Sequence, residues 1–168
     1  MALTMYQVAV PTMLRGLGVL SGYLDKAAAF AQEKGLPPAR LIGARLAPDM
    51  FTFGQQIQRA SDKAKNGIAR LAVVDAPTFA DEEASIEDFK HRIKRTTEFL
   101  QSIDADKFAG AESRILELKL RAATGPFRGD AYLLSILLPD FYFHVTTAHD
   151  ILRNQGVQIG KVDYFGKL

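Results

Sequence analysis

The sequence contains no cysteine among its 168 residues. Disulfide bonds, thiol catalysis and cysteine-based zinc sites are therefore excluded, and the composition fits a reducing compartment. No apolar run reaches the ~20 residues that a membrane-spanning helix requires. The first fourteen residues carry no charged side chain, but they lack the basic start and the cleavage site of a signal peptide. We therefore expect a cytoplasmic protein without a membrane segment.

A large charge of one sign is also missing. Lysine and arginine total 21 against 19 aspartate and glutamate residues, which leaves a net charge of +2. Such a small charge produces little long-range attraction for phosphates, and no cluster of basic residues resembles a nucleic-acid-binding patch. Nucleic acid is therefore not an expected partner. The hydrophobic content of 48% is ordinary for a soluble globular protein, and we expect residues 1–168 to form a single domain.

Four long segments have apolar residues at the three- and four-residue spacing of amphipathic helices. The first is expected to follow Thr4 as N-cap and to end at Gly35. The other three are predicted to begin at Pro48, after the Ser85–Asp88 capping box, and near Asp130. Pro139 lies inside the last of these helices, where it is expected to produce a kink.

Residues 114–120 instead alternate between polar and apolar side chains, which is typical of a β-strand. Gly125-Pro126 is expected to turn the chain, and Phe127 would then begin a short return strand. Together the segments predict an all-α fold, a four-helix bundle with a small β-hairpin between its third and fourth helices.

The fourth helix contains the most informative residues. Asp140 and His144 lie one turn apart on the same face of a helix that is otherwise largely apolar. A carboxylate at this spacing orients or charges an imidazole, as around general bases and metal-bound histidines, although an ordinary hydrogen-bonded pair has the same spacing. His149 lies about 140° further around the axis, so the two histidines cannot bind one metal together, and we expect it to face a loop or solvent.

The second helix offers partners for His144. Three polar residues at seven-residue intervals line one flank of this helix: Asp49, Gln56 and Lys63. If the flank faces the fourth helix, Asp49 and Gln56 converge with His144 on one ligand-binding pocket, which Phe141 and Tyr142 would help to shape. Alone, Asp49 equally fits a role at the helix N-terminus, where the helix dipole favours a carboxylate.

A second apolar surface is predicted on the back of the fourth helix. Tyr132, Ile136 and Phe143 fall together there. Large exposed apolar patches usually mark an interface. We therefore expect either that the hairpin covers this patch or that it forms a homodimer.

Three segments carry a family resemblance: Pro48–Phe51, Phe141–Ala148 and Ile151–Gly166. They resemble a bacterial domain-of-unknown-function family within the DinB/YfiT-like helical bundles. The resemblance implies a four-helix bundle, often dimeric, related to metal-dependent enzymes that include thiol S-transferases. Metal-binding members use one histidine from the second helix and two at i, i+4 on the fourth. Here the second helix has no histidine and Ala148 follows His144, so only His144 carries over as a metal ligand.

Two functions therefore stay open at this stage. In the first, the protein binds a small molecule between its second and fourth helices and acts on it. His144 would then serve as acid/base or as the sole imidazole ligand of a divalent metal, supported by Asp140 or Asp49. The incomplete ligand set favours no tightly bound metal. In the second, the protein is a non-catalytic dimeric or partner-binding bundle that has lost the ancestral metal site.

Overall fold

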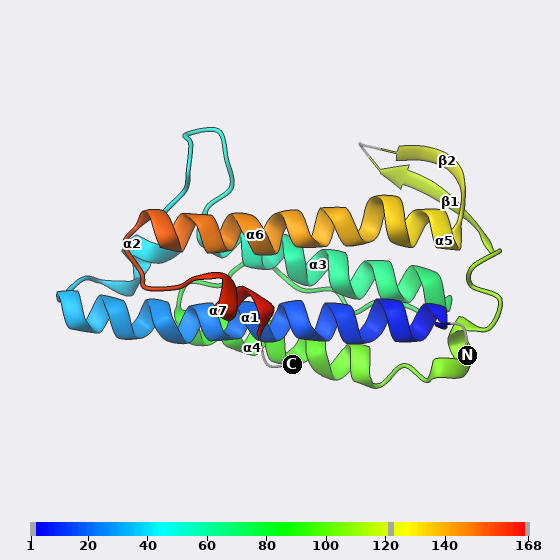
Figure 1. The fold of residues 1–168 in the computed structure, drawn as a ribbon, viewed down its shortest axis with the longest axis horizontal. Helices are drawn as coiled ribbons and strands as arrows, with labels where there is room; N and C mark the ends of the chain where they lie inside the picture. Colours follow the sequence, from blue (N-terminus) through cyan, green and yellow to red (C-terminus); the bar gives the residue numbers. More distant parts are fainter. Residues whose placement is uncertain (1–2, 121–122, 167–168) are drawn as a thin grey trace.

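The computed structural model describes residues 3–120 and 123–166 of the protein. Four long helices run side by side (Figure 1). They are α1 (Met5–Lys34), α3 (Phe53–Ala72), α4 (Ile86–Gln101) and α6 (Leu138–Asn154). Because α1 and α3 each contact both α4 and α6, the helices form a closed ring around the apolar core. The predicted four-helix bundle is confirmed.

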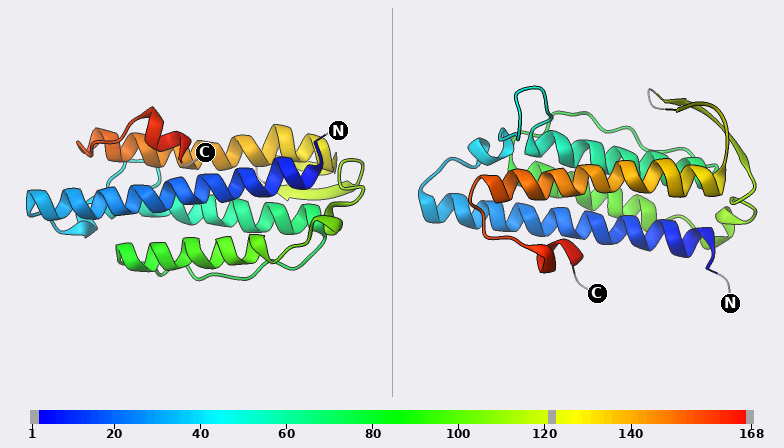
Figure 2. Two further views of the ribbon diagram at one scale, coloured as in Figure 1. Left: turned by 60° about the horizontal axis from the view of Figure 1, so that its bottom comes forward. Right: turned by 45° about the horizontal axis from the view of Figure 1, so that its top comes forward.

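The shorter elements connect and cover the bundle. They are α2 (Pro38–Ile42), the 3₁₀-helix η1 (Ala105–Phe108), strands β1 (Ile115–Leu120) and β2 (Ala123–Arg128), α5 (Gly129–Tyr132), the π-helical η2 (Leu133–Leu137) and α7 (Lys161–Phe165). The hairpin stands at one end of α6, whereas α7 lies along α1 (Figure 2). Within the part of the chain that the structure describes, no helix is long and apolar enough to cross a membrane.

Capping boxes begin three of the long helices. The side chains of Thr4 and Ser85 accept from the backbone N–H groups of Gln7 and Asp88, whose side chains accept from the cap residues in return. Both caps confirm the sequence prediction, as does the left-handed Gly35 that ends α1. These signals are readable from sequence because each involves residues within one turn.

The predicted start of the second long helix is wrong. The helix begins at Phe53, where Thr52 and Gln55 form a third capping box. Pro48 and Asp49 lie in a turn before it. A capping box satisfies two backbone donors that a proline at the first helical position leaves unsatisfied, so the Thr52 start is the more stable one.

The turn predicted at Gly125-Pro126 is also wrong. Gly125 pairs with Leu118 and Pro126 with Glu117, so both residues lie inside β2. The connection between the strands passes through residues 121–122, which lie outside the described residues. A proline is tolerated in β2 because each strand of a two-stranded hairpin is an edge strand, whose outward N–H groups need no partner strand.

A π turn stands where the sequence predicted a kink. Helical backbone continues from Gly129 to Asn154, but η2 widens immediately before Pro139. Proline lacks an N–H, and its ring meets the carbonyl four residues earlier in a regular α-helix. A local π turn removes that conflict without ending the helix.

The π turn rotates the preceding residues relative to the predicted face. Leu133, Leu137 and Phe141 are buried in the core at four-residue spacing, whereas Leu134 is 59% exposed. The predicted apolar patch on the back of the helix is divided for the same reason. Tyr132 is buried and Phe143 is exposed, so they do not share one surface.

Two glycines of α1 provide a test of this packing. A Cβ atom at Gly16 would lie 2.4 Å from the ring of Phe141, whereas one at Gly18 would meet nothing within 4 Å. Alanine stabilises a helix interior by about 0.5–1 kcal/mol relative to glycine, and overpacking a core costs about 1–3 kcal/mol. We therefore expect Gly18→Ala to raise the free energy of unfolding and Gly16→Ala to lower it, measured by urea denaturation. Equal effects of the two substitutions would contradict the close contact of α6 with α1.

Candidate functional site

His144 points inward from α6 and is only 6% exposed. Its Nδ1 atom lies 2.7 Å from Oε1 of Gln56 on α3. The Gln56 amide nitrogen donates to the backbone oxygen of Phe51 at 3.3 Å, which fixes the carboxamide with its oxygen toward the imidazole. Because this oxygen can only accept, Nδ1 of His144 carries a proton and donates it.

Asp140 holds the other side of the imidazole. Its Oδ1 atom is 3.4 Å from Nε2 of His144, and its Oδ2 atom is 2.6 Å from Nζ of Lys63 on α3. Burial alone would raise the pKa of the Asp140 carboxyl, but the hydrogen bonds from His144 and Lys63 outweigh it and lower the pKa. The carboxylate is therefore ionised at neutral pH, and it completes a polar chain from Gln56 through His144 and Asp140 to Lys63.

This polar chain ends in a groove of about 220 Å³ between α3 and the continuous helix α5–η2–α6. Five polar side chains of α3 line one wall: Arg59, Asp62, Lys63, Asn66 and Arg70. Asp140 lines the opposite wall together with side chains of α5 and η2. Asp140 thus joins the buried imidazole to the groove.

Close packing of η2 on α3 forms one boundary of the groove. A Cβ atom at Gly67 would lie 2.2 Å from the side chain of Leu137, so the glycine allows the π turn to approach α3 directly. Both residues line the groove. The irregular helix near Pro139 and the site therefore occupy the same place, as π turns often do at functional sites.

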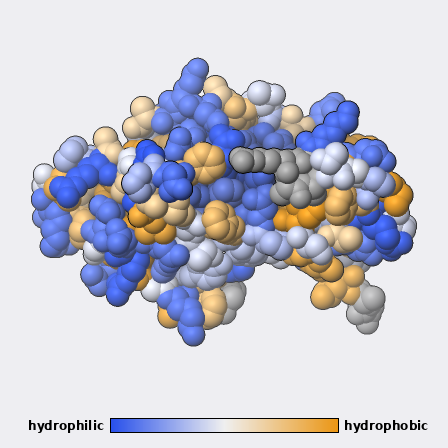
Figure 3. All heavy atoms as spheres, turned by 90° about the horizontal axis from the view of Figure 1, so that it is seen from above, coloured by the Kyte–Doolittle hydropathy of each residue, from blue (hydrophilic) through white to orange (hydrophobic). Residues whose placement is uncertain are grey.

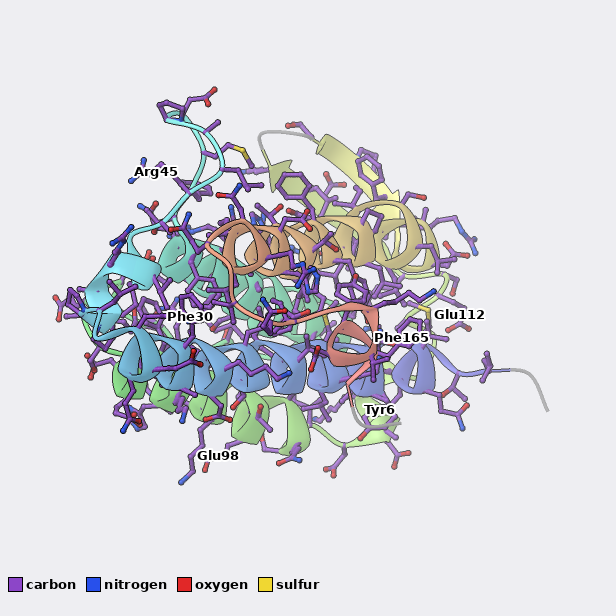
Figure 4. All side chains as sticks on the ribbon, turned by 60° about the vertical axis from the view of Figure 1, so that its left-hand side comes forward. Tyr6, Phe30, Arg45, Glu98, Glu112 and Phe165 are labelled. Atoms are coloured by element: carbon purple, nitrogen blue, oxygen red, sulfur yellow. The ribbon has the colours of Figure 1, made fainter. Side chains whose placement is uncertain are left out.

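Asp49 does not join His144, contrary to the expectation from the seven-residue spacing. It is exposed in residues 43–52, a loop that stands away from the helices. Arg45 marks this loop in Figure 4. Within residues 3–120 and 123–166, no hydrogen bond or ion pair involves Asp49. The expectation fails because α3 begins at Phe53, which leaves Asp49 outside the helix and off the flank that Gln56 and Lys63 share.

Phe141 and Tyr142 also lie away from the groove. Phe141 is fully buried against α1 at Gly16, as a core residue. The Tyr142 hydroxyl accepts from the Arg15 guanidinium and donates to the backbone oxygen of Thr12 at 3.4 Å, both in α1. The prediction that these two residues shape the His144 pocket is corrected: consecutive residues turn about 100° around a helix, which carries both side chains toward α1.

His149 lies neither in a loop nor free in solvent. Its Nδ1 atom is 2.8 Å from the hydroxyl of Tyr23, and the ring of Tyr164 packs edge-on against it. Burial is the main reason that the pKa of Tyr23 is raised, so its hydroxyl stays neutral. Tyr23 also lines a second hollow of about 670 Å³ between α1 and α7. The label of Phe165 marks α7 in Figure 4.

The α3 wall of the groove could have been predicted by extending the seven-residue pattern toward the C-terminus of the helix. Gln56 and Lys63 share a flank at seven-residue spacing, and the next position is Arg70, which lines the groove. The sequence reasoning extended the same pattern back to Asp49 instead. Tyr132 on the opposite wall carried no such signal, because the π turn that places it there is not visible in the hydrophobic periodicity.

The donor set does not fit a divalent metal. Within the described ranges, no three histidine, aspartate or glutamate side chains lie close enough to hold one ion. The Asp140 carboxylate beside His144 is already paired with the Lys63 ammonium at 2.6 Å, and a metal bound there would be repelled by that cation. Gln56, whose oxygen faces His144, is a poor ligand for zinc or nickel.

Comparison with known proteins finds similarity over most of the chain. The family model described as "Domain of unknown function (DUF1993)" matches residues 5–165. A crystal structure described as a DinB family member from Shewanella denitrificans is 34% identical, covers 97% of this chain and 92% of its own, and superposes with a TM-score of 0.91. No curated protein matches. Because one family model spans nearly all of the bundle, this chain belongs to the DUF1993 family and has the DinB-like fold.

Proposed function

We propose that this protein binds a small molecule in the groove between α3 and α6 and exchanges a proton with it through the Asp140–His144 pair. The observation that carries the proposal is the fixed polar chain from Gln56 to Lys63, which reaches the groove at Asp140. Carboxylate–imidazole pairs of this kind move protons in general acid–base catalysis.

The protonation states support this role. Gln56 accepts the hydrogen on Nδ1 of His144, so Nε2 is the ring nitrogen that faces the carboxylate. Nε2 faces Asp140, whose lowered pKa results from hydrogen bonds that outweigh its burial. The ionised Asp140 carboxylate therefore connects the buried imidazole to the edge of the groove. Lys63 fixes that carboxylate and supplies a positive charge beside any ligand.

Replacement of His144 tests the proposal. We expect members of a panel of small metabolites, including low-molecular-weight thiols, to raise the melting temperature of the wild-type protein. His144→Ala should remove most of each shift, because Asp140 loses the imidazole that lies 3.4 Å from its carboxylate. His91→Ala is the matched control, since His91 is exposed on α4. Equal shifts in the two variants, or no shift in the wild type, would contradict the proposal.

The same proposal includes no tightly bound metal. Metal analysis of protein purified without a histidine tag should find well under one ion per chain, with no difference between the wild type and His144→Ala. A stoichiometric ion that disappears on this substitution would instead make His144 a metal ligand. The lack of cysteine in this protein further supports a location in the cytoplasm.

A second candidate function is a dimeric or partner-binding bundle without catalysis. It is favoured by two exposed side chains of the continuous α5–η2–α6 helix, Leu134 (59% exposed) and Phe143 (58% exposed). Seen from above the view of Figure 1, the surface has hydrophobic side chains scattered among hydrophilic ones (Figure 3). A homodimer in light scattering, together with no ligand in the metabolite panel, would favour this function over the first.

A further inference from the structure

We propose that the ligand of the α3–α6 groove is a small monocarboxylate and that Arg70 and Tyr132 bind its carboxylate group. This inference rests on the proposed function, because it names the class of molecule that the same groove would hold. It depends on the charges and hydrogen bonds at the end of the groove away from His144.

Arg70 is the cation of the groove that forms no ion pair with any described residue. Lys63 is paired with Asp140, and Arg59 is paired with Asp81 and lies 3.7 Å from Asp62. For Arg70, the described parts of the chain provide only the hydroxyl of Tyr132, which accepts from its Nη1 atom at 2.8 Å. Guanidinium groups bind carboxylates through two parallel hydrogen bonds, and Arg70 has further N–H groups for this purpose.

Tyr132 adds a second donor at the same place. Its side chain is 2% exposed and lines the groove. Burial raises the pKa of Tyr132 despite the nearby Arg70 cation, so the hydroxyl keeps its proton. That hydroxyl accepts from Arg70, and nothing in the described ranges accepts its own hydrogen in return. A buried hydroxyl with an unused hydrogen is costly unless a partner arrives, and a carboxylate oxygen is a suitable one.

The charge of the groove matches a monoanion. Its lining has three cationic side chains, Arg59, Lys63 and Arg70, against two carboxylates, Asp62 and Asp140. One anionic group balances this set. A phosphate dianion would exceed the balance and would lie near Asp140, which is itself ionised.

The dimensions match a short molecule. The groove holds about 220 Å³, which equals the volume of about seven water molecules. Arg70 and Lys63 are seven residues apart, or about 10 Å along α3. A carboxylate bound at Arg70 would place the other end of a short carbon chain near Lys63 and Asp140. Ile136 and Leu137 provide apolar contact for the chain between them.

The test is an NMR titration of the full chain with butyrate and hexanoate, with butyramide and hexanamide as neutral analogues. We expect each acid to bind at least tenfold more tightly than its amide, because the hydrogen bonds to a charged group are lost in the amide. Arg70→Gln and Tyr132→Phe should each weaken acid binding about tenfold without changing amide binding. Arg95→Gln on α4 is the matched control and should change neither.

The possible failures are distinguishable. Equal binding of acid and amide, tighter binding of inorganic phosphate, or acid binding that survives Arg70→Gln would each overturn the monocarboxylate inference. If neutral compounds nevertheless bind in a His144-dependent way, the proposed function stands without it. If neither acid binds, the inference is also overturned. The metabolite panel then tests the proposed function separately. Melting temperatures of both variants confirm that any weaker binding does not reflect unfolding.

Discussion

Replacement of Arg92 by methionine should lower the free energy of unfolding by about 3 kcal/mol, as measured by urea denaturation. The Arg92 guanidinium lies almost wholly buried between α4, α3 and the loop that joins them. It makes five polar contacts of 2.8–3.2 Å, to Asp62, Asp81, Glu83, Ser61 and the backbone oxygen of Ala80. Methionine retains much of the side-chain volume and removes every donor.

The size of this effect follows from the carboxylates that lose their partner when the guanidinium is removed. Breaking a buried ion pair by removing one partner costs about 3–5 kcal/mol, because the other charge is left without compensation. The three carboxylates here are 11–39% exposed and regain some water, which places the expected loss near the lower limit. Hydrogen exchange in residues 73–85 should also become faster, since Arg92 ties Asp81, Glu83 and Ala80 of this loop to the bundle.

Arg95→Met is the control for Arg92. Arg95 is exposed on the same helix, and its guanidinium lies 4.2 Å from the ring centre of Phe79 in the loop. A surface cation–π contact contributes about 0.5–1 kcal/mol, so this substitution should have a small effect. Similar losses for both variants would show that the Arg92 network is a surface contact rather than a buried clamp.

The Arg92 network also reaches the candidate site. Asp62 accepts from Arg92 at 2.9 Å and lines the α3–α6 groove. Arg59 lines the same groove and is paired with Asp81 in the loop. The charges of the groove are therefore held from both sides, by Asp140 on α6 and by the loop before α4. Loss of Arg92 should weaken ligand binding as well as stability.

The sequence predicted those parts of the fold that depend on nearby residues. Thr4 was identified as an N-cap and Ser85–Asp88 as a capping box, because both signals involve residues within one turn. The same reasoning overlooked Thr52, since Pro48 offered a familiar start a few residues earlier. The four-helix bundle was predicted from the spacing of apolar residues, which reflects the burial of a whole helix face. An error of a few residues at one helix end does not change that prediction.

The candidate site was only partly predictable for a different reason. Asp140 and His144 share a helix face, so their contact at 3.4 Å follows from local geometry. The contact of His144 with Gln56 depends on how α3 packs on α6. The seven-residue pattern limited the candidate partners of His144 to one flank of α3. Tyr132 was placed on the wrong surface because the π turn adds a residue to the helix. Periodicity assumes a constant rotation per residue and cannot detect that change.

Substitution of Phe141 distinguishes a role in core packing from a role in ligand binding. The sequence assigned this residue to the pocket, whereas the structure buries it against α1. We expect Phe141→Ala to lower the free energy of unfolding by about 3–5 kcal/mol, as for large-to-small changes in a close-packed core. The ring is 0% exposed and fills the space that Gly16 leaves on α1, which cannot collapse while both helices stay in place. Urea denaturation followed by circular dichroism measures the loss.

Phe143→Ala is the matched control, since Phe143 is 58% exposed two residues further along α6. Exposed side chains lose little on truncation, so its effect should stay within about 0.5 kcal/mol. Because neither ring lines the groove, any compound that binds there should keep its affinity in Phe143→Ala, and also in Phe141→Ala at temperatures where that variant is folded. A selective loss of binding in stable, folded Phe141→Ala would return this residue to the ligand site and would contradict the burial on which the α1–α6 packing depends.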